Sequence, residues 1–200
     1  MAINYPLTAT FKVLSLSPEV TVRDSSNALM LQVKQKGFTL REETTVFADE
    51  AKKVPLYKMI ADRVIGFRAV HKITRLADNA LVGAVKAAGF RSLWRTEYAI
   101  TDSSDQQILT VREENPWIKV LDSLVDEIPL VGFIIATFIN PRYLMTDQSG
   151  TLLYRITKKR SFLESRFILE QIAPEAAQER DERLIALALI QVIFLEKHRG

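Results

Sequence analysis

Hydrophobic and polar residues alternate along most of this chain in short runs, and these runs are broken by an aspartate followed by small polar residues. Four stretches share the pattern: VTVRDSSNALMLQV, TVFADEAKKVPLYKM, YAITDSSDQQILTV and YLMTDQSGTLLYRI. Alternation with a period of two is typical of strands that bury one face, and an aspartate carboxylate can accept the backbone N–H groups just ahead of it in a tight turn. We therefore predict four β-hairpins, with a shorter fifth hairpin in ITRLADNALVGAV.

Two further runs predict single strands. They are TATFKVLS near the N-terminus and SRFILEQI near residue 168. Their β-branched and aromatic residues favour the extended conformation. Since five hairpins contribute about ten strands, the sequence predicts about twelve strands in all.

The C-terminal sequence changes to a helical pattern. A proline suits the first turn, and charged residues match the helix dipole at both ends: Pro174, Glu175 and Glu179, then Lys197, His198 and Arg199. The apolar run from Leu184 to Leu195 is interrupted only by Gln191. At 1.5 Å per residue this run is about 18 Å long, against about 30 Å for the hydrocarbon core of a bilayer. We predict a helix that is too short to span a membrane.

A helix that is apolar on every side needs apolar surroundings. An antiparallel sheet rolled around the helix supplies them and removes the open sheet edges. A helix is about 10 to 12 Å across, whereas an eight-stranded barrel has room inside only for side chains. We therefore predict a mainly β fold with one domain over residues 1–200: a closed antiparallel barrel of about twelve strands around a buried hydrophobic C-terminal α-helix.

The segment NPWIKVLDSLVDEIPLVGFIIATFINP departs from the hairpin pattern. It begins with Asn115 as a cap and Pro116 in the first turn, and its apolar residues recur at helical spacing. We predict an amphipathic helix near 115–128, followed by an uncharged run from Ile128 to Asn140. Two alternatives stay open: the segment folds back as a cap over the barrel mouth, or residues 128–139 are exposed and contact a membrane.

The net charge of +3 is small but unevenly distributed. Ten lysines and arginines lie between Lys52 and Arg95 against two acids, Asp62 and Asp78, which leaves −5 for the rest of the chain. This asymmetry predicts a basic face that attracts anionic partners. The candidate lipid-binding residues are these cations and two aromatic residues of the following segment: Arg63, Arg68, Lys72, Arg75, Lys86, Arg91, Arg95, Trp117 and Phe133.

Catalytic, metal and nucleotide motifs are lacking in the sequence. It has no cysteine, and its histidines are His71 and His198, which we interpret as structural and as dipole compensation at a helix end. No serine has G-x-S-x-G around it, and no glycine-rich phosphate loop occurs. The stretch Asp102 to Glu113 has acids where a calcium loop begins and ends but lacks its central glycine, so a hairpin turn is the better interpretation. We expect no enzyme activity, no cofactor and no metal.

The hairpins centred on aspartate, the segments LQVKQKGFTLREETTVFADE and YLMTDQSGTLLYRI, and the apolar C-terminal helix together resemble the tubby C-terminal-like superfamily. The resemblance is to its LURP-one-related and phospholipid-scramblase-like branch. It covers nearly the whole chain and implies an antiparallel barrel threaded by its C-terminal helix.

The resemblance also implies a non-enzymatic binding or scaffold module that docks to anionic phospholipid membrane surfaces through a basic barrel face. The alternative is a carrier or enzyme for a small apolar ligand, with residues 115–141 as a lid. We expect no nucleic-acid partner, because few aromatic residues accompany the basic ones. The N-terminus lacks a basic start followed by an apolar run, so we expect a cytoplasmic protein with peripheral membrane attachment.

Overall fold

The computed structural model describes residues 3–12, 17–36, 42–62, 70–87, 97–114, 142–160, 164–177 and 181–197. These residues form twelve strands and two helices. The first six strands are β1 (Leu7–Lys12), β2 (Glu19–Arg23), β3 (Leu29–Gln35), β4 (Glu43–Phe47), β5 (Pro55–Ala61) and β6 (Val70–Arg75). The others are β7 (Leu81–Ala87), β8 (Glu97–Asp102), β9 (Gln107–Glu113), β10 (Arg142–Thr146), β11 (Leu152–Arg160) and β12 (Glu164–Gln171). Helices α3 (Pro174–Ala177) and α4 (Glu182–Lys197) follow.

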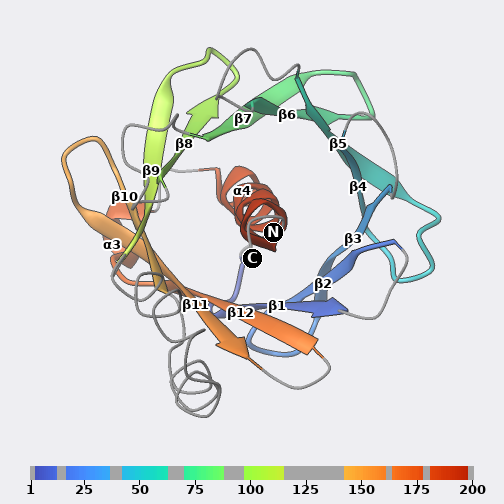
Figure 1. The fold of residues 1–200 in the computed structure, drawn as a ribbon, viewed down its shortest axis with the longest axis horizontal. Helices are drawn as coiled ribbons and strands as arrows, with labels where there is room; N and C mark the ends of the chain where they lie inside the picture. The colour runs from blue at the N-terminus through green and yellow to red at the C-terminus, as the bar shows by residue number, and fades with distance from the viewer. Residues whose placement is uncertain are drawn as a thin grey trace, which may run out of the picture.

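The strands form a closed barrel in which each strand pairs with its sequence neighbours, and β12 pairs with β1 to close the ring. All pairings are antiparallel. Figure 1 shows the ring around α4. The predicted fold class is therefore confirmed: the five hairpins and the two single strands of the prediction are the twelve strands of the barrel.

The aspartate turns work as the sequence pattern indicated. Asp102 is representative, because its Oδ1 accepts the backbone N–H groups of Ser104 at 2.8 Å and Gln106 at 3.0 Å. The carbonyl of Asp102 accepts the N–H of Asp105, whose φ is +64°. One residue with positive φ recurs in each of the five turns, namely Asn27, Lys52, Asn79, Asp105 and Gly150, and each ladder shifts register next to its turn. Such a left-handed residue after a tight turn restores the strand twist.

Helix α4 lies along the barrel axis, and its residues from Leu184 to Glu196 are all buried. Because Asp181 Oδ1 accepts the N–H of Arg183 at 2.9 Å and the carbonyl of Asp181 accepts the N–H of Ile185, Asp181 is the N-cap. The prediction of one helix from Pro174 onward is corrected here, since the structure has the short α3 first and starts α4 only after this cap.

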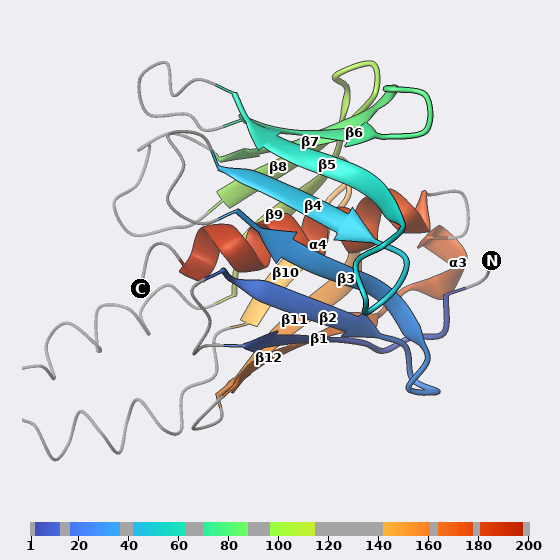
Figure 2. The same ribbon diagram turned by 90° about the vertical axis from the view of Figure 1, so that its right-hand side faces the viewer.

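The two ends of the barrel differ, and Figure 2 shows them on opposite sides. At one end, which we call the turn end, lie the five tight hairpin turns, the N-terminus and the start of α4. At the other end, which we call the exit end, α4 finishes and the remaining strand connections begin and end. Glu114 and Arg142 lie at the exit end, where the backbone N–H of Glu114 donates to the carbonyl of Arg142. The helix predicted near 115–128 lies outside the described residues.

Candidate functional site

The predicted lipid-binding residues that the structure describes are neutralised by acids. Lys72 and Lys86 lie on the outer face of neighbouring strands β6 and β7. Lys72 Nζ lies 2.8 Å from Asp62, Lys86 Nζ lies 2.6 Å from Asp105, and Arg75 lies 3.4 Å from Asp78. The hydrogen bond from Lys86 lowers the pKa of Asp105, and that to Asp62 raises the pKa of Lys72. This face therefore presents paired charges.

The other predicted site residues lie outside the described residues: Arg63, Arg68, Arg91, Arg95, Trp117 and Phe133. The structure brings Lys72 and Lys86 onto one face, while Arg75 stands at the end of β6 next to the turn. For the six residues outside the described ranges, the lipid-binding role remains a prediction.

A buried polar cluster lies inside the barrel at its exit end. The carboxylate of Glu196 on α4 accepts hydrogen bonds from Tyr98 Oη at 2.7 Å and from Tyr143 Oη at 2.6 Å. Glu113, which is opposite Tyr143 in the β9–β10 ladder, is also buried. Burial, followed by the charge of Glu196, raises the pKa of Tyr143 well above the usual value for a phenol. The hydroxyl of Tyr143 thus stays protonated and donates, which ties the end of α4 to the wall.

The predicted structural role of His71 agrees with its position inside the barrel wall. Its Nε2 lies 3.0 Å from Glu42 Oε2, and its side chain is 3% exposed. Its Nδ1 has no hydrogen-bond partner among the residues that the structure describes. Since no serine, threonine or cysteine is bonded to His71 there, the geometry supplies no nucleophile for it to activate.

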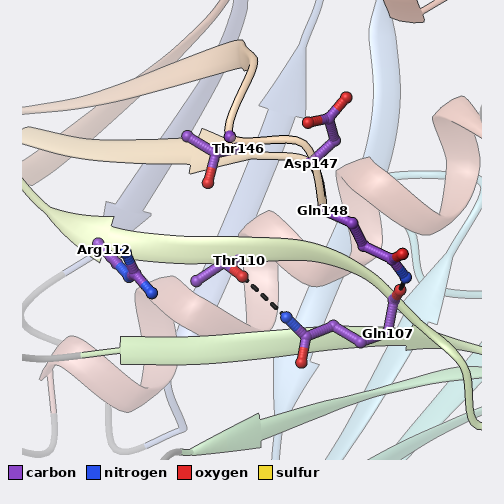
Figure 3. A pocket seen from close by; sticks show the side chains of 7 residues that line it. Gln107, Thr110, Arg112, Thr146, Asp147 and Gln148 are labelled. Carbon is purple, nitrogen blue, oxygen red and sulfur yellow. Dashed lines mark hydrogen bonds between the residues drawn. The ribbon is translucent and has the colours of Figure 1, made fainter.

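A shallow groove of about 470 Å³ lies on the outer surface beneath the β10–β11 turn. Its lining comes from β9 and from that turn: Gln107, Thr110, Arg112, Thr146, Asp147, Gln148 and Gly150. Figure 3 shows Gln107 Nε2 donating to Thr110 Oγ1, at 2.8 Å, and Gln148 reaching the carbonyl of Gln107. Arg112 already pairs with Glu97 through two nitrogens. The polar groups of the groove therefore largely bond to one another.

Charge is unevenly distributed along the barrel axis, although acids and cations lie at both ends. The turn end carries the turn aspartates and the cap of α4: Asp24, Asp49, Asp78, Asp102, Asp105, Asp147 and Asp181. Cations gather at the exit ends of β1, β3, β10, β11 and β12: Lys12, Lys34, Lys36, Arg142, Lys158, Lys159 and Arg166. Acids also lie at the exit end: Glu19, Glu42, Glu43, Asp62, Glu97, Glu113, Glu114, Glu164 and Glu196. The turn end in turn includes the cations Arg23, Lys52, Lys53 and Arg75. Sequence reasoning missed the cation group of the exit end, although the run Lys158 to Arg160 is visible in the sequence, because its members come from five separate strands.

No protein-family model and no curated protein matches this chain. Within the described ranges, the helices are too short or too polar to cross a bilayer. In the same part of the chain, no three histidine or acidic side chains come together as metal ligands would.

Proposed function

We propose that this protein is a non-enzymatic binding module that docks to anionic phospholipid surfaces through a basic face of its barrel. The observation that carries the proposal is the uneven distribution of charge along the axis: acids are in excess at the turn end, whereas the exit end carries a cluster of cations on β10, β11, β12 and β1. An anionic surface repels the acidic turn end and attracts this cluster, so it orients the molecule as well as binding it. Cytoplasmic location with peripheral membrane attachment is part of this proposal.

The filled interior supports a role for the outer surface. Leu189, Ile190 and Phe194 of α4 are fully buried, and the ring of Phe194 packs edge-on against that of Phe11 on β1, with 5.8 Å between centroids. The axis of the barrel is thus occupied by protein. The alternative, an apolar ligand held beneath residues 115–141, concerns a segment outside the described residues, and no contact described above favours it.

The expected strength of docking is modest. Each lysine or arginine near an anionic membrane contributes about 1 kcal/mol, so four such residues contribute about 4 kcal/mol. That free energy corresponds to a dissociation constant of about 1 mM, which is too weak for stable attachment. A second contribution from inserted apolar side chains is therefore part of the proposal, and Trp117 and Phe133 are the candidates from the sequence.

Vesicle co-sedimentation tests the proposal. We expect the full chain to sediment with vesicles that contain phosphatidylserine and to stay in the supernatant with phosphatidylcholine alone. Raising the salt from about 0.1 M to about 1 M shortens the Debye length from about 10 Å to about 3 Å and should release most of the protein. Binding that depends on neither headgroup charge nor salt concentration would contradict the proposal.

A further inference from the structure

The strand register places four cations of the exit end in one unbroken line. Lys159 on β11 lies directly opposite Arg166 on β12. Arg142 on β10 is opposite Thr157, two residues from Lys159, so Arg142 and Lys159 are diagonal neighbours. Lys12 on β1 is likewise two residues from Thr10, which is opposite Arg166. Directly opposed residues have Cβ atoms about 5 Å apart and diagonal ones about 7 to 8 Å apart. We call these four residues the basic stripe.

Stability does not explain why the cations Lys159 and Arg166 lie directly opposite each other. Two like charges directly opposite each other on one face of a sheet destabilise it. Arg166 lies 3.5 Å from Glu164 and Arg142 lies 3.9 Å from Glu114. Lys12 lies directly opposite Glu164 on β12 and Glu19 on β2. For Lys159, the described part of the chain offers no acid within ion-pair distance. The like-charge pair of Lys159 and Arg166 therefore has a local cost in stability, which indicates a binding surface.

On the other side of the barrel, the wall formed by β6 and β7 carries cations that acids neutralise. There, the tip of the β8–β9 turn leans over the outer face of β7 and brings Asp105 to Lys86. The charge of Asp105 also acts on Lys72 of β6. Strand β12, in contrast, is followed by α3 and not by a hairpin turn, so it carries no acidic tip of its own. The four cations of the stripe have three neighbouring acids, Glu19, Glu114 and Glu164. In the β6–β7 wall, Lys72, Lys86 and Arg75 each pair with an acid of their own, so the stripe keeps an excess positive charge that this wall lacks.

We propose that the basic stripe is the docking surface, and that its occupant is an anionic bilayer. This inference rests on the proposed function and names the part of the molecule that performs it. Bilayer contact fits better than nucleic acid, because the exposed large hydrophobic residues among those described are Val54, Leu81 and Ile172, none of them aromatic. Single-stranded nucleic acids are bound by stacking bases on aromatic side chains as well as by charge.

The stripe also predicts how the barrel sits on the membrane. Its residues lie at the exit ends of β10, β11, β12 and β1, next to the point where residues 115–141 leave at Glu114 and return at Arg142. Docking on the stripe thus brings Glu114 and Arg142 toward the membrane and leaves the turn end, with its aspartates, in solvent.

The test compares two double variants that each remove two positive charges. Lys159→Gln with Arg166→Gln alters the stripe, and Lys72→Gln with Lys86→Gln alters the β6–β7 wall by the same net charge. The probe is a vesicle of phosphatidylcholine with about one third phosphatidylserine. Lys159 has no acid within ion-pair distance among the described residues, and Glu164, the acid near Arg166, also faces Lys12. A loss of about 1 to 2 kcal/mol therefore predicts that the stripe variant binds about 5- to 30-fold more weakly than the wild type. The wall variant should stay within about threefold, because its lysines are already paired. Thermal melts of both variants check that they fold.

A site-specific fluorophore tests the orientation of the barrel on the membrane. The chain contains no cysteine, so a dye attached to Thr157→Cys beside the stripe or to Ser149→Cys in a turn is site-specific. We expect a blue shift on vesicle binding from the dye at 157 and little change from the dye at 149.

The outcomes separate the two proposals. If the wild-type chain does not bind vesicles that contain phosphatidylserine, the proposed function is overturned. A wild-type chain that binds, with both double variants weakened equally or the wall variant weakened more, overturns the assignment to the stripe and leaves the function standing. Tighter binding to an oligonucleotide than to vesicles at equal salt would show that the occupant is wrong.

Discussion

Glu196 stands at the end of an apolar helix, yet its carboxylate is buried between two tyrosine hydroxyls. A helix that is apolar on all sides can rotate or slide by a turn without exposing anything polar. Buried polar contacts fix such a register, because every alternative position leaves them unmatched. At the other end, the backbone N–H of Ile3 donates to Glu182 at 3.3 Å. The position of α4 is therefore set by polar contacts at its two ends.

The first residue-scale prediction concerns the two tyrosines. Tyr98→Phe with Tyr143→Phe removes two hydrogen bonds to a carboxylate, each worth about 1.5 to 3 kcal/mol, so we expect the free energy of unfolding to fall by about 3 to 6 kcal/mol. Urea denaturation followed by fluorescence measures this. Tyr57→Phe on β5 is the control, since the hydroxyl of Tyr57 has no side-chain partner among the described residues, and it should cost less than about 1 kcal/mol. Equal losses in the double variant and the control would contradict the role of Glu196.

At the scale of elements, β7 and α4 approach each other at Gly83. A Cβ atom placed there would lie 2.3 Å from the carbonyl oxygen of Thr101 on β8 and 2.9 Å from Cδ1 of Leu184. Both distances are shorter than van der Waals contact, and one of the neighbours is backbone. The glycine therefore allows the first turn of the helix to pack directly on the sheet, which a larger residue would prevent.

Two glycine variants separate crowding from backbone strain. Gly83→Ala should cost about 3 kcal/mol or more, because either the β7–β8 pair or the helix must move. Gly150→Ala in the β10–β11 turn meets no atom within 4 Å but has φ of +85°, so we expect a loss of about 1 to 2 kcal/mol from the backbone alone. Denaturation midpoints compare the two directly. A Gly83→Ala variant no less stable than Gly150→Ala would show that helix and sheet are not packed as described.

The whole molecule is a closed ring whose turns depend on ionised aspartates. Hydrogen bonds from Ser26 lower the pKa of Asp24, and those from the backbone of Lys53 and Val54 lower the pKa of Asp49. The side chain of Lys86 does the same for Asp105. A carboxyl whose pKa is lower in the folded than in the unfolded state stabilises the fold above its unfolded pKa. That contribution is lost as the pH falls through the folded pKa.

Acid unfolding tests this at the scale of the molecule. We expect the free energy of unfolding to be nearly constant between about pH 5 and 7 and to fall below about pH 4, where the aspartates begin to be protonated. Asp49→Asn keeps an oxygen acceptor for Lys53 but cannot titrate, so its curve should fall less steeply than that of the wild type. Parallel curves for the two proteins would contradict a contribution from this turn. At high pH, the raised pKa of Tyr143 has the corresponding effect. It predicts that the free energy of unfolding falls above about pH 10, where tyrosine ionises in the unfolded chain.

Much of the architecture was predictable because its signals are local. The aspartate in each turn, the alternation within each strand and the uninterrupted apolar helix are all properties of neighbouring residues. The barrel then followed from the need to cover a helix that has no polar face. The break between α3 and α4 was not predicted, since Pro174 and Asp181 are both acceptable helix starts and only the packing of α4 inside the barrel selects Asp181.

The candidate surface shows the limit of sequence reasoning. Counting charges along the chain pointed to Lys52 to Arg95, but Lys72, Arg75 and Lys86 are paired with acids in the fold. The stripe was not visible in the same count, because Lys12 and Arg166 are far apart in the sequence and meet only through the β1–β12 pairing that closes the ring. Periodicity and turn chemistry act between neighbours, so the sequence by itself determined the strands, the turns and the buried helix. Electrostatic fields depend on distance in space, so only the tertiary structure decided which charges are cancelled and which stand together.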